Sequence, residues 1–365
     1  MGCTIPEKDY VIVFDASSDT LYDTLLFFHY DLLEARATGA AGDDAFVSRA
    51  IAVAAPSLGD DCTFARYFRM EDDRMIETLD ERPRRPRCVH FLHFRPETEI
   101  ALHRRLSRQC SHCRIPMANP YTQGTACCDS KYRMYQALTA RKIDTPDAVL
   151  FSRFRSAGER SDSRSDVFDA PQGFYLQPDR GTEGQGCSFF LPSQREEALG
   201  LLRDSRCDMI ARPRRGTARY LGRNLVCRIN VCFDGRRYAA ESGYAMQGND
   251  VVCAANRATK ENINTVLAAV DPGGAVAEAL TGVCHAACRT LFQGAEPTLA
   301  CGVDAVIETD DVSSRAYVID VNPRPVVVGS RVIGSDTIGL GHAFWRGVRS
   351  RITSAQGARS GGRGG

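Results

Sequence analysis

The sequence predicts an α/β protein of more than one domain, and three observations support this class. Apolar runs with strand character alternate with helical stretches in the first third of the chain. At 365 residues, the chain is too long for one simple core. Its 43% hydrophobic and 25% charged residues are typical of a globular protein. We therefore expect two or three packed units.

The first unit is expected to cover residues 1–120 as an α/β domain. Its opening apolar run reads as a buried parallel strand that ends at Asp15. The predicted strands are 10–15, 50–55 and 89–94, and the predicted helices are 18–37 and 97–109. The arginine-rich stretch 82–87 follows acidic residues and is expected to be a solvated loop.

The second unit is expected at 121–210. A helix over 129–138 could be capped by Asp129, and a helix from Ser193 to about residue 203 begins with a capping box. The predicted strands are 147–151, 174–177, 188–191 and 207–212. Residues 152–166 are polar without periodicity and are expected to be irregular.

The third unit is expected at 211–352. Asp234 and Gly235 form a hairpin signal between strands at 225–233 and 236–244. A helix over 274–292, strands at 301–308 and 316–321, and a helix at 342–352 follow. The glycine-rich residues 353–365 have nothing to bury, which predicts a disordered tail.

Charge and cysteine content exclude several classes of protein. A formal net charge of +1 argues against a nucleic-acid partner. No signal peptide or membrane-length apolar run is present, and the 15 cysteines are scattered and odd in number. We expect free thiols in a cytoplasmic protein without a membrane partner. Cys110 and Cys113 could hold zinc, but a structural pair is favoured because no second ligand pair has suitable spacing.

The sharpest functional signal lies in the last two predicted strands. If they pair as a hairpin with a turn centred near Val312, Asp304 faces Asp320. Asn322 then projects on the same side, because alternate residues share a strand face. Opposed carboxylates repel unless a cation lies between them, and oxygen ligands suit Mg²⁺. A magnesium site is favoured over the alternative, an ordinary hairpin with a polar face.

Two further features are weaker alone. Gly181, Gly184 and Gly186 lie in a turn between two strands, where backbone N–H groups could close on phosphate oxygens. The turn has neither the Walker A lysine nor a following helix. Arg228 lies within an apolar strand and needs a partner, which a phosphate or a structural salt bridge would supply.

Taken in order, these features resemble the ATP-grasp superfamily over about residues 119–327. Its pattern is matched by 129–131 at a helix start, 142–146 before a strand, Gln177-Pro178 before the glycine-rich turn, and Asp320-Val321-Asn322-Pro323-Arg324. The resemblance implies two α+β subdomains that clasp ATP, preceded by an N-terminal domain that carries part of the acceptor site. It also implies chemistry in which a carboxylate is activated as an acyl phosphate and attacked by an amine.

The resemblance also implies roles for individual residues. Adenine would contact the backbone near Ile210 and Arg212, and Lys131 and Gln177 would lie at the nucleotide phosphates together with the glycine-rich turn. Arg228 would meet the γ-phosphate or the substrate carboxylate. Asp304, Asp320 and Asn322 would hold magnesium, as two ions. Arg324 could clamp the substrate carboxylate through a two-pronged contact.

Two departures from the family pattern bear on activity. Asp320 stands where a glutamate is usual, and Gln177 stands where a lysine normally touches the phosphates. Arg180 or Arg212 could supply the missing charge. The leading function is therefore an ATP-dependent ligase for a small carboxylate and an amine. An ATP-grasp kinase and a nucleotide-binding pseudoenzyme are the alternatives, and assembly as a homodimer is compatible with the sequence.

Overall fold

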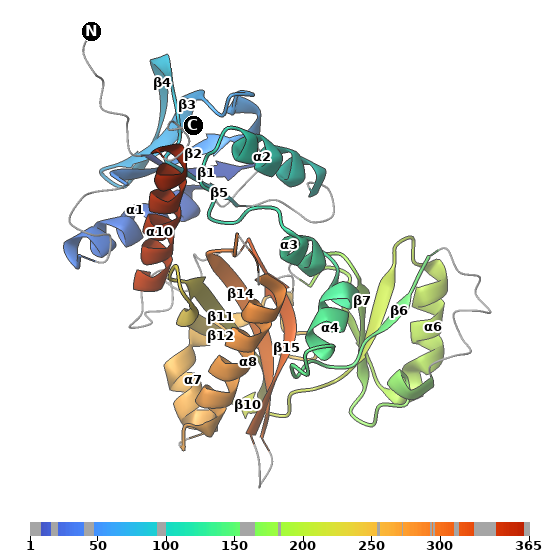
Figure 1. Ribbon diagram of the computed structural model, residues 1–365. Helices are drawn as coiled ribbons and strands as arrows, with labels where there is room; N and C mark the ends of the chain where they lie inside the picture. Colours follow the sequence, from blue (N-terminus) through green and yellow to red (C-terminus); the bar gives the residue numbers. More distant parts are fainter. Residues whose placement is uncertain are drawn as a thin grey trace.

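The computed structural model of the chain describes residues 9–15, 21–39, 47–92, 100–153, 165–181, 184–253, 256–271, 273–292, 294, 296–309, 314–324 and 341–360. Three β-sheets form three units (Figure 1). The parts of the predicted elements at 16–20, 93–99 and 154–164 lie outside the described residues.

The N-terminal sheet has the strand order β4-β3-β2-β1-β5. Its strands are β1 (Asp9–Phe14), β2 (Arg49–Ala54), β3 (Phe64–Glu71), β4 (Arg74–Arg84) and β5 (Cys88–Phe91). β1 is parallel to β2 and β5, and all of its residues are buried. Alternate side chains of β1 enter two cores, on opposite faces of the sheet. The predicted parallel α/β layer is confirmed.

Helices cover both faces of this sheet. α1 (Leu21–Ala37) and α10 (Gly341–Ser360) contribute to one core, and α2 (Ile100–His112) contributes to the other. A short 3₁₀ helix (Ala55–Ser57) follows β2. α10 continues eight residues past the predicted end at 352, so the expected disorder from 353 is wrong as far as Ser360. Residues 361–365 lie outside the described residues.

The antiparallel hairpin of β3 and β4 was not predicted, and it corrects the reading of 82–87 as a solvated loop. Arg84 belongs to β4 and is only 10% exposed at its side chain. Its guanidinium pairs with the fully buried Asp9 at 2.6 Å, and Arg49 pairs with the same carboxylate at 2.7 Å. The arginine therefore neutralises a buried acid at the start of β1.

The central sheet is antiparallel, with the order β6-β9-β7-β8. Its strands are β6 (Val149–Phe151), β7 (Phe174–Pro178), β8 (Ser188–Phe190) and β9 (Met209–Pro213). Short 3₁₀ helices (Ser165–Val167 and Pro192–Gln194) and α6 (Arg195–Asp204) complete the unit. Its core is rich in phenylalanine and is covered by Ala198 and Leu202 of α6.

The C-terminal sheet is antiparallel, with the order β13-β12-β11-β14-β15 and β10 paired to β11. The strands are β10 (Arg219–Tyr220), β11 (Arg223–Phe233), β12 (Tyr238–Gly248), β13 (Thr259–Asn262), β14 (Ala300–Thr309) and β15 (Ser314–Asn322). The predicted turn is confirmed, since the carboxylate of Asp234 accepts from the N–H groups of Arg236 and Arg237, and Gly235 has a φ of +98°.

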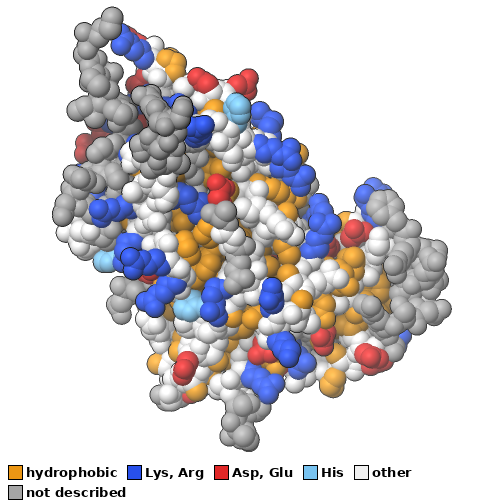
Figure 2. Space-filling view, in the orientation of Figure 1, with side chains coloured by type: hydrophobic (Ala, Val, Ile, Leu, Met, Phe, Trp, Pro, Cys, Tyr) orange, Lys and Arg blue, Asp and Glu red, His pale blue; other side chains and the backbone are white. Residues whose placement is uncertain are grey.

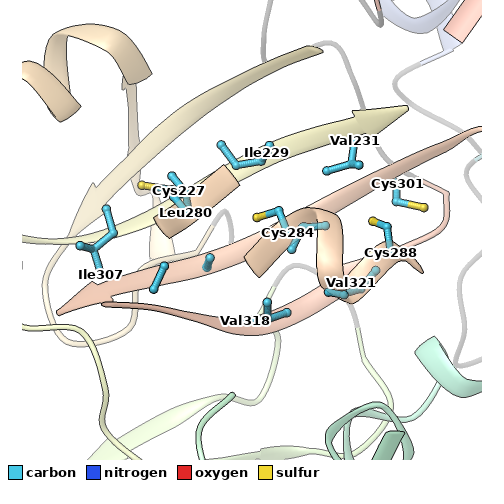
Figure 3. Close-up of a cluster of buried hydrophobic side chains, with 14 of the residues drawn as sticks. Cys227, Ile229, Val231, Leu280, Cys284, Cys288, Cys301, Ile307, Val318 and Val321 are labelled. Carbon is cyan, nitrogen blue, oxygen red and sulfur yellow. The ribbon is translucent and has the colours of Figure 1, made fainter. Parts of the chain in front are cut away.

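One face of the C-terminal sheet packs against α7 (Ile263–Val270) and α8 (Ala275–Phe292). Figure 3 shows this core, where Cys227, Cys284, Cys288 and Cys301 lie among branched aliphatic side chains. All described cysteines are free, and many are buried as small apolar residues.

Helices α3 (Gln123–Cys128) and α4 (Lys131–Thr139) fall in the range expected for the central subdomain. Their buried side chains Cys128, Met134 and Leu138 nevertheless join the core of the C-terminal sheet. α4 lies between the central and C-terminal sheets in Figure 1. β9 also extends to Pro213, so the central sheet ends after the boundary expected at 210.

The surface carries charges of both signs. On the face in Figure 2, Lys and Arg side chains are spread over all parts of the molecule, with acidic side chains among them. This distribution is in keeping with the formal net charge of +1. Within the described residues, no helix has both the length and the apolar character required to cross a membrane.

Candidate functional site

The C-terminal sheet has one face that α7 and α8 leave open. Val226, Tyr244, Met246, Val306 and Tyr317 form a small apolar cluster on this face. The charged side chains Arg228, Asp304 and Asp320 lie on the same face, because each is directly opposite the next on β11, β14 and β15. The open face therefore carries a row of ionisable groups across three strands.

The predicted hairpin register is confirmed. Asp304 pairs with Asp320, and Gly302 pairs with Asn322. The structure adds a β-bulge that regular alternation did not predict. Ala305 pairs with Val318, so Ile319 is an extra residue on β15. Because Val318 and Val321 both enter the helix-side core, Ile319 and Asp320 are both directed to the open face.

Arg228 supplies a positive charge beside the opposed carboxylates. Its Nε and Nη2 atoms donate to the two oxygens of Asp304, the second at 2.7 Å, and each side chain is 13% exposed. Burial alone would lower the pKa of Arg228, but Asp304 raises it overall. Burial raises the pKa of Asp304, and Arg228 opposes that shift. The structural salt bridge anticipated for Arg228 is therefore present.

Gly302 makes room for this pair. A Cβ atom there would lie 2.8 Å from Nη1 and 3.0 Å from Cδ of Arg228. Non-bonded heavy atoms rarely approach so closely, so a larger residue would displace the arginine side chain. The close approach of Arg228 to β14 thus requires glycine at this position.

Asp320 and Asn322 each accept one hydrogen bond from a nearby main-chain N–H. Asp320 accepts from the N–H of Val321 at 3.1 Å and forms no ion pair within the described part of the chain. The Asn322 amide oxygen accepts from the N–H of Arg324 at 2.9 Å. Because a carboxylate oxygen accepts more than one hydrogen bond, Asp304 also retains lone pairs.

This donor set fits magnesium. Two carboxylates and one amide oxygen share a face, which leaves other positions around a Mg²⁺ ion for water or phosphate.

A metal site made only of His, Cys, Asp and Glu is a separate question. Across the described residues, no group of three or more such side chains could hold a metal ion. The zinc alternative for Cys110 and Cys113 therefore gains no support, although Cys62 lies 3.8 Å from Cys110, measured between Sγ atoms.

Lys131 lies at the start of α4 and faces the central sheet. Ser130 caps the helix by accepting from the N–H of Arg133, which corrects the expectation that Asp129 does so. Asp179, just after β7, accepts from the Ser130 hydroxyl at 3.0 Å. The Lys131 Nζ donates to the carbonyl of Gly181 at 2.7 Å. This lysine therefore contacts the glycine-rich turn.

The glycine-rich turn reaches across to the C-terminal sheet. Gly184 and Gly186 have φ values of +74° and +69°, which a residue with a side chain rarely adopts. A Cβ atom on Gly184 would lie 2.6 Å from Sγ of Cys253, a residue after β12. Thr182 and Glu183 lie outside the described residues.

Gln177 and Arg212 project from the same face of the central sheet. Gln177 is opposite Ile210 and Tyr175 is opposite Arg212, while the alternate residues enter the phenylalanine-rich core. Ile210 also pairs with Leu150 on β6, so its backbone lies between two strands. The predicted adenine contact through the Ile210 backbone is therefore disfavoured, because the sheet occupies both sides.

Arg212 itself is buried and holds two elements together. Its Nη1 donates to the carbonyl of Ile319 at 2.6 Å, and its Nη2 donates to the carbonyl of Lys131 at 3.0 Å. Burial lowers the pKa of Arg212, and Asp320 and Asp179 oppose that shift.

Arg324 does not face an open site. It is 6% exposed, and its Nη2 forms an ion pair with Asp129. Its Nη1 lies 3.1 Å from Nδ1 of His103, and Tyr121 donates to the other oxygen of Asp129 at 2.9 Å. Both ends of the fork are thus occupied, which contradicts its predicted role as a free clamp for a substrate carboxylate.

Two features of this region were not predicted from the sequence. Lys260 on β13 lies 5.0 Å from the ring centroid of Tyr244, which is opposite Arg228. Burial lowers the pKa of Lys260, and Arg228 lowers it further. The network of His103, Asp129 and Arg324 joins elements more than 190 residues apart. No local motif marks either feature.

No protein-family model matches the sequence, and a comparison with curated proteins finds no match. The structure, however, is similar to solved ligase structures over nearly its whole length. D-alanine–D-alanine ligase from Coxiella burnetii superimposes with a TM-score of 0.61 at 11% identity, covering 98% of each chain.

Two further solved structures are similar. VanG D-Ala:D-Ser ligase from Enterococcus faecalis gives a TM-score of 0.59 at 13% identity, covering 96% of this chain and 99% of that one. D-cycloserine synthetase DcsG gives a TM-score of 0.56 at 14% identity, covering 95% of this chain and 99% of that one. These neighbours are ATP-grasp proteins. The chain therefore has the ATP-grasp fold, as the sequence motifs predicted.

Proposed function

We propose that this chain is an ATP-dependent ligase that activates a carboxylate as an acyl phosphate and joins it to an amine, releasing ADP and phosphate. The observation that carries the proposal is the row of Arg228, Asp304 and Asp320 on the open face of a sheet in an ATP-grasp fold. Solved structures with the same fold are named as a D-alanine–D-alanine ligase and a D-Ala:D-Ser ligase. The substrates proposed are accordingly an amino acid or peptide and a small amine.

ATP would lie between the central and C-terminal sheets. The glycine-rich turn and Lys131 border this space on one side, and the open face borders it on the other. We assign the phosphates to Lys131, the backbone of the turn and Lys260. β6 pairs with β9 only as far as Ala211, so the Arg212 backbone is paired on the β7 side alone. Adenine would contact the backbone there, on the side that β6 leaves unpaired.

Asp304, Asp320 and Asn322 would hold magnesium, as two ions in the family pattern. Bound magnesium would neutralise phosphate charge and align the γ-phosphoryl group. Asp320 is the strongest candidate ligand, because it has no ion-pair partner among the described residues.

Arg228 and Arg324 are proposed to have different roles. Arg228 uses Nε and Nη2 on Asp304, which leaves Nη1 to meet the γ-phosphate or the substrate carboxylate. Arg324 is better assigned as a positioning residue. Its main-chain N–H fixes the Asn322 amide, and its guanidinium pairs with Asp129 two residues before Lys131.

The test is ADP release from Mg-ATP with a panel of carboxylic acids paired with amines. Hydroxylamine should trap an acyl phosphate as a hydroxamate, whereas a kinase that phosphorylates a hydroxyl would yield none. Asp320→Asn should lower turnover by at least about a hundredfold with the fold intact. Glu308→Gln, at the far end of the same hairpin, is the matched control and should keep turnover.

The pseudoenzyme alternative rests on the uncharged Gln177. Nucleotide binding without turnover for any acid and amine pair would favour it over the ligase. We also propose a cytoplasmic location, which the free thiols of the described cysteines support. Sedimentation of the purified chain would decide between a monomer and a homodimer.

A further inference from the structure

A buried arginine in the proposed nucleotide site has one donor without a partner. Arg212 is 3% exposed, and its Nε has no hydrogen-bond acceptor among the described residues. The other two nitrogens donate to main-chain carbonyls of Ile319 and Lys131, so no carboxylate contacts the guanidinium directly. Asp320 and Asp179 favour the charged form of Arg212 without a hydrogen bond to it, so its Nε still lacks the acceptor that a buried donor normally has.

The position of Arg212 is fixed by its two anchors. Ile319 is the bulged residue beside Asp320, and Lys131 begins the helix whose side chain reaches the glycine-rich turn. The guanidinium therefore joins the central sheet, the proposed metal strand and the proposed phosphate-binding helix. This pre-organisation would spare a ligand the entropy of ordering the arginine.

The surroundings point to an anion as the missing partner. Burial raises the pKa of the Cys187 thiol to about 12, while Lys131 and Arg212 both act to lower it. The two cations thus converge near the end of the glycine-rich turn. Gln177 projects from the same face of the central sheet but carries no charge.

We propose that Arg212 is a phosphate-binding residue for the nucleotide, with Nε donating to a phosphate oxygen, and that it supplies the cation that Gln177 does not. The inference deepens the proposed function and rests on it. The ligand class is a nucleoside triphosphate with its magnesium. An arginine anchored on main-chain carbonyls would bind the phosphate as a fixed donor, unlike a flexible lysine.

The test measures the dissociation constant of Mg-ATP by isothermal titration calorimetry, without the acid or the amine. Arg212→Met should weaken binding by at least about tenfold, as expected when a hydrogen bond to a charged group is lost. The double variant Gln177→Lys with Arg212→Met should recover affinity to within about threefold of the original. Arg214→Met removes a cation that follows β9 and lies over the Phe189 ring, and it should leave affinity unchanged.

Each outcome decides the proposal. Unchanged affinity in Arg212→Met overturns it, and so does a loss that Gln177→Lys fails to recover in a folded protein, since Arg212 is then only a structural link. If Arg212→Met does not fold, Arg212→Lys replaces it. A lysine lacks the anchored Nε donor, so affinity should again fall by about tenfold, and unchanged affinity in folded Arg212→Lys overturns the proposal. Failure of the unaltered chain to bind Mg-ATP would instead contradict the proposed function.

Discussion

His103 should make the protein sensitive to acid, and the size of the effect follows from the structure. The imidazole is fully buried, with Nε2 lying 3.2 Å from the carbonyl of Asn119 and Nδ1 lying 3.1 Å from Arg324. These partners require a neutral ring that donates from Nε2 and accepts at Nδ1. Protonation would place a second cation against the guanidinium. Burial and Arg324 accordingly lower the pKa of His103 from 6.5 to about 3.

The sign and magnitude follow from linkage. Because the pKa is lower in the folded state, the unfolded chain binds more protons between pH 6.5 and about 3, and stability falls as the pH drops through that window. At about pH 5, the unfolded histidine is almost fully protonated and the folded one is not. The free energy of unfolding should therefore be lower by about 2 kcal/mol than at about pH 7.5.

The assay is urea unfolding of the original chain and of His103→Gln at these two pH values. A glutamine amide can donate to Asn119 and accept from Arg324 but does not titrate in this range. The variant should lose about 2 kcal/mol less on acidification than the original chain does. His112→Gln, an exposed histidine at the end of the same helix, is the control and should behave as the original. Equal acid losses in the original chain and His103→Gln would refute the reasoning, as would an NMR titration of His103 near pH 6.5.

Three further substitutions test packing and charge through the free energy of unfolding. Gly124→Ala would place a Cβ atom 2.0 Å from a main-chain carbonyl of α8 and should cost several kcal/mol, whereas Gly282→Ala meets open space within α8 and should stabilise by about 0.5–1 kcal/mol; similar values for the two would contradict the packing. Asp9→Asn leaves two arginines beside an uncharged buried group and should cost about 3–5 kcal/mol, and a loss below about 1 kcal/mol would show that the pair is solvated. Gly302→Ala should displace Arg228, lower stability by about 1–3 kcal/mol and reduce ADP release as strongly as Arg228→Met does; unchanged turnover would remove Arg228 from the proposed mechanism.

Elements with a recognisable pattern of apolar residues could be predicted from the sequence. β1 was found because it is a continuous apolar run, and α8 and the hairpin of β14 and β15 were found from apolar residues at the spacing of a helix or strand. The opposition of Asp304 and Asp320 followed from the same regularity. β4 was missed because charged and polar residues occupy most of it, and much of the strand is exposed. Its identity depends on pairing with β3, which no local pattern records.

The candidate site was only partly predictable for a related reason. The bulge at Ile319 shifts the register by one residue, and the counter-charge on Asp304 comes from a strand 76 positions earlier. Arg324 looked free because its partner, Asp129, lies in a distant segment. Such contacts depend on how the three units pack together. Composition and spacing along the chain carry no information about that packing.

The docking of α10 has a consequence for how the protein is made. The aromatic core under the first sheet combines Tyr10 and Phe28 with Phe344 and Trp345, and the Trp345 indole donates to the buried Asp31 at 2.6 Å. On the ribosome, the first domain therefore emerges long before its final helix exists. Its aromatic face must stay uncovered while the other two sheets are synthesised, which is when newly made chains are most prone to aggregate. The first of the three units is thus completed only after the other two have been synthesised.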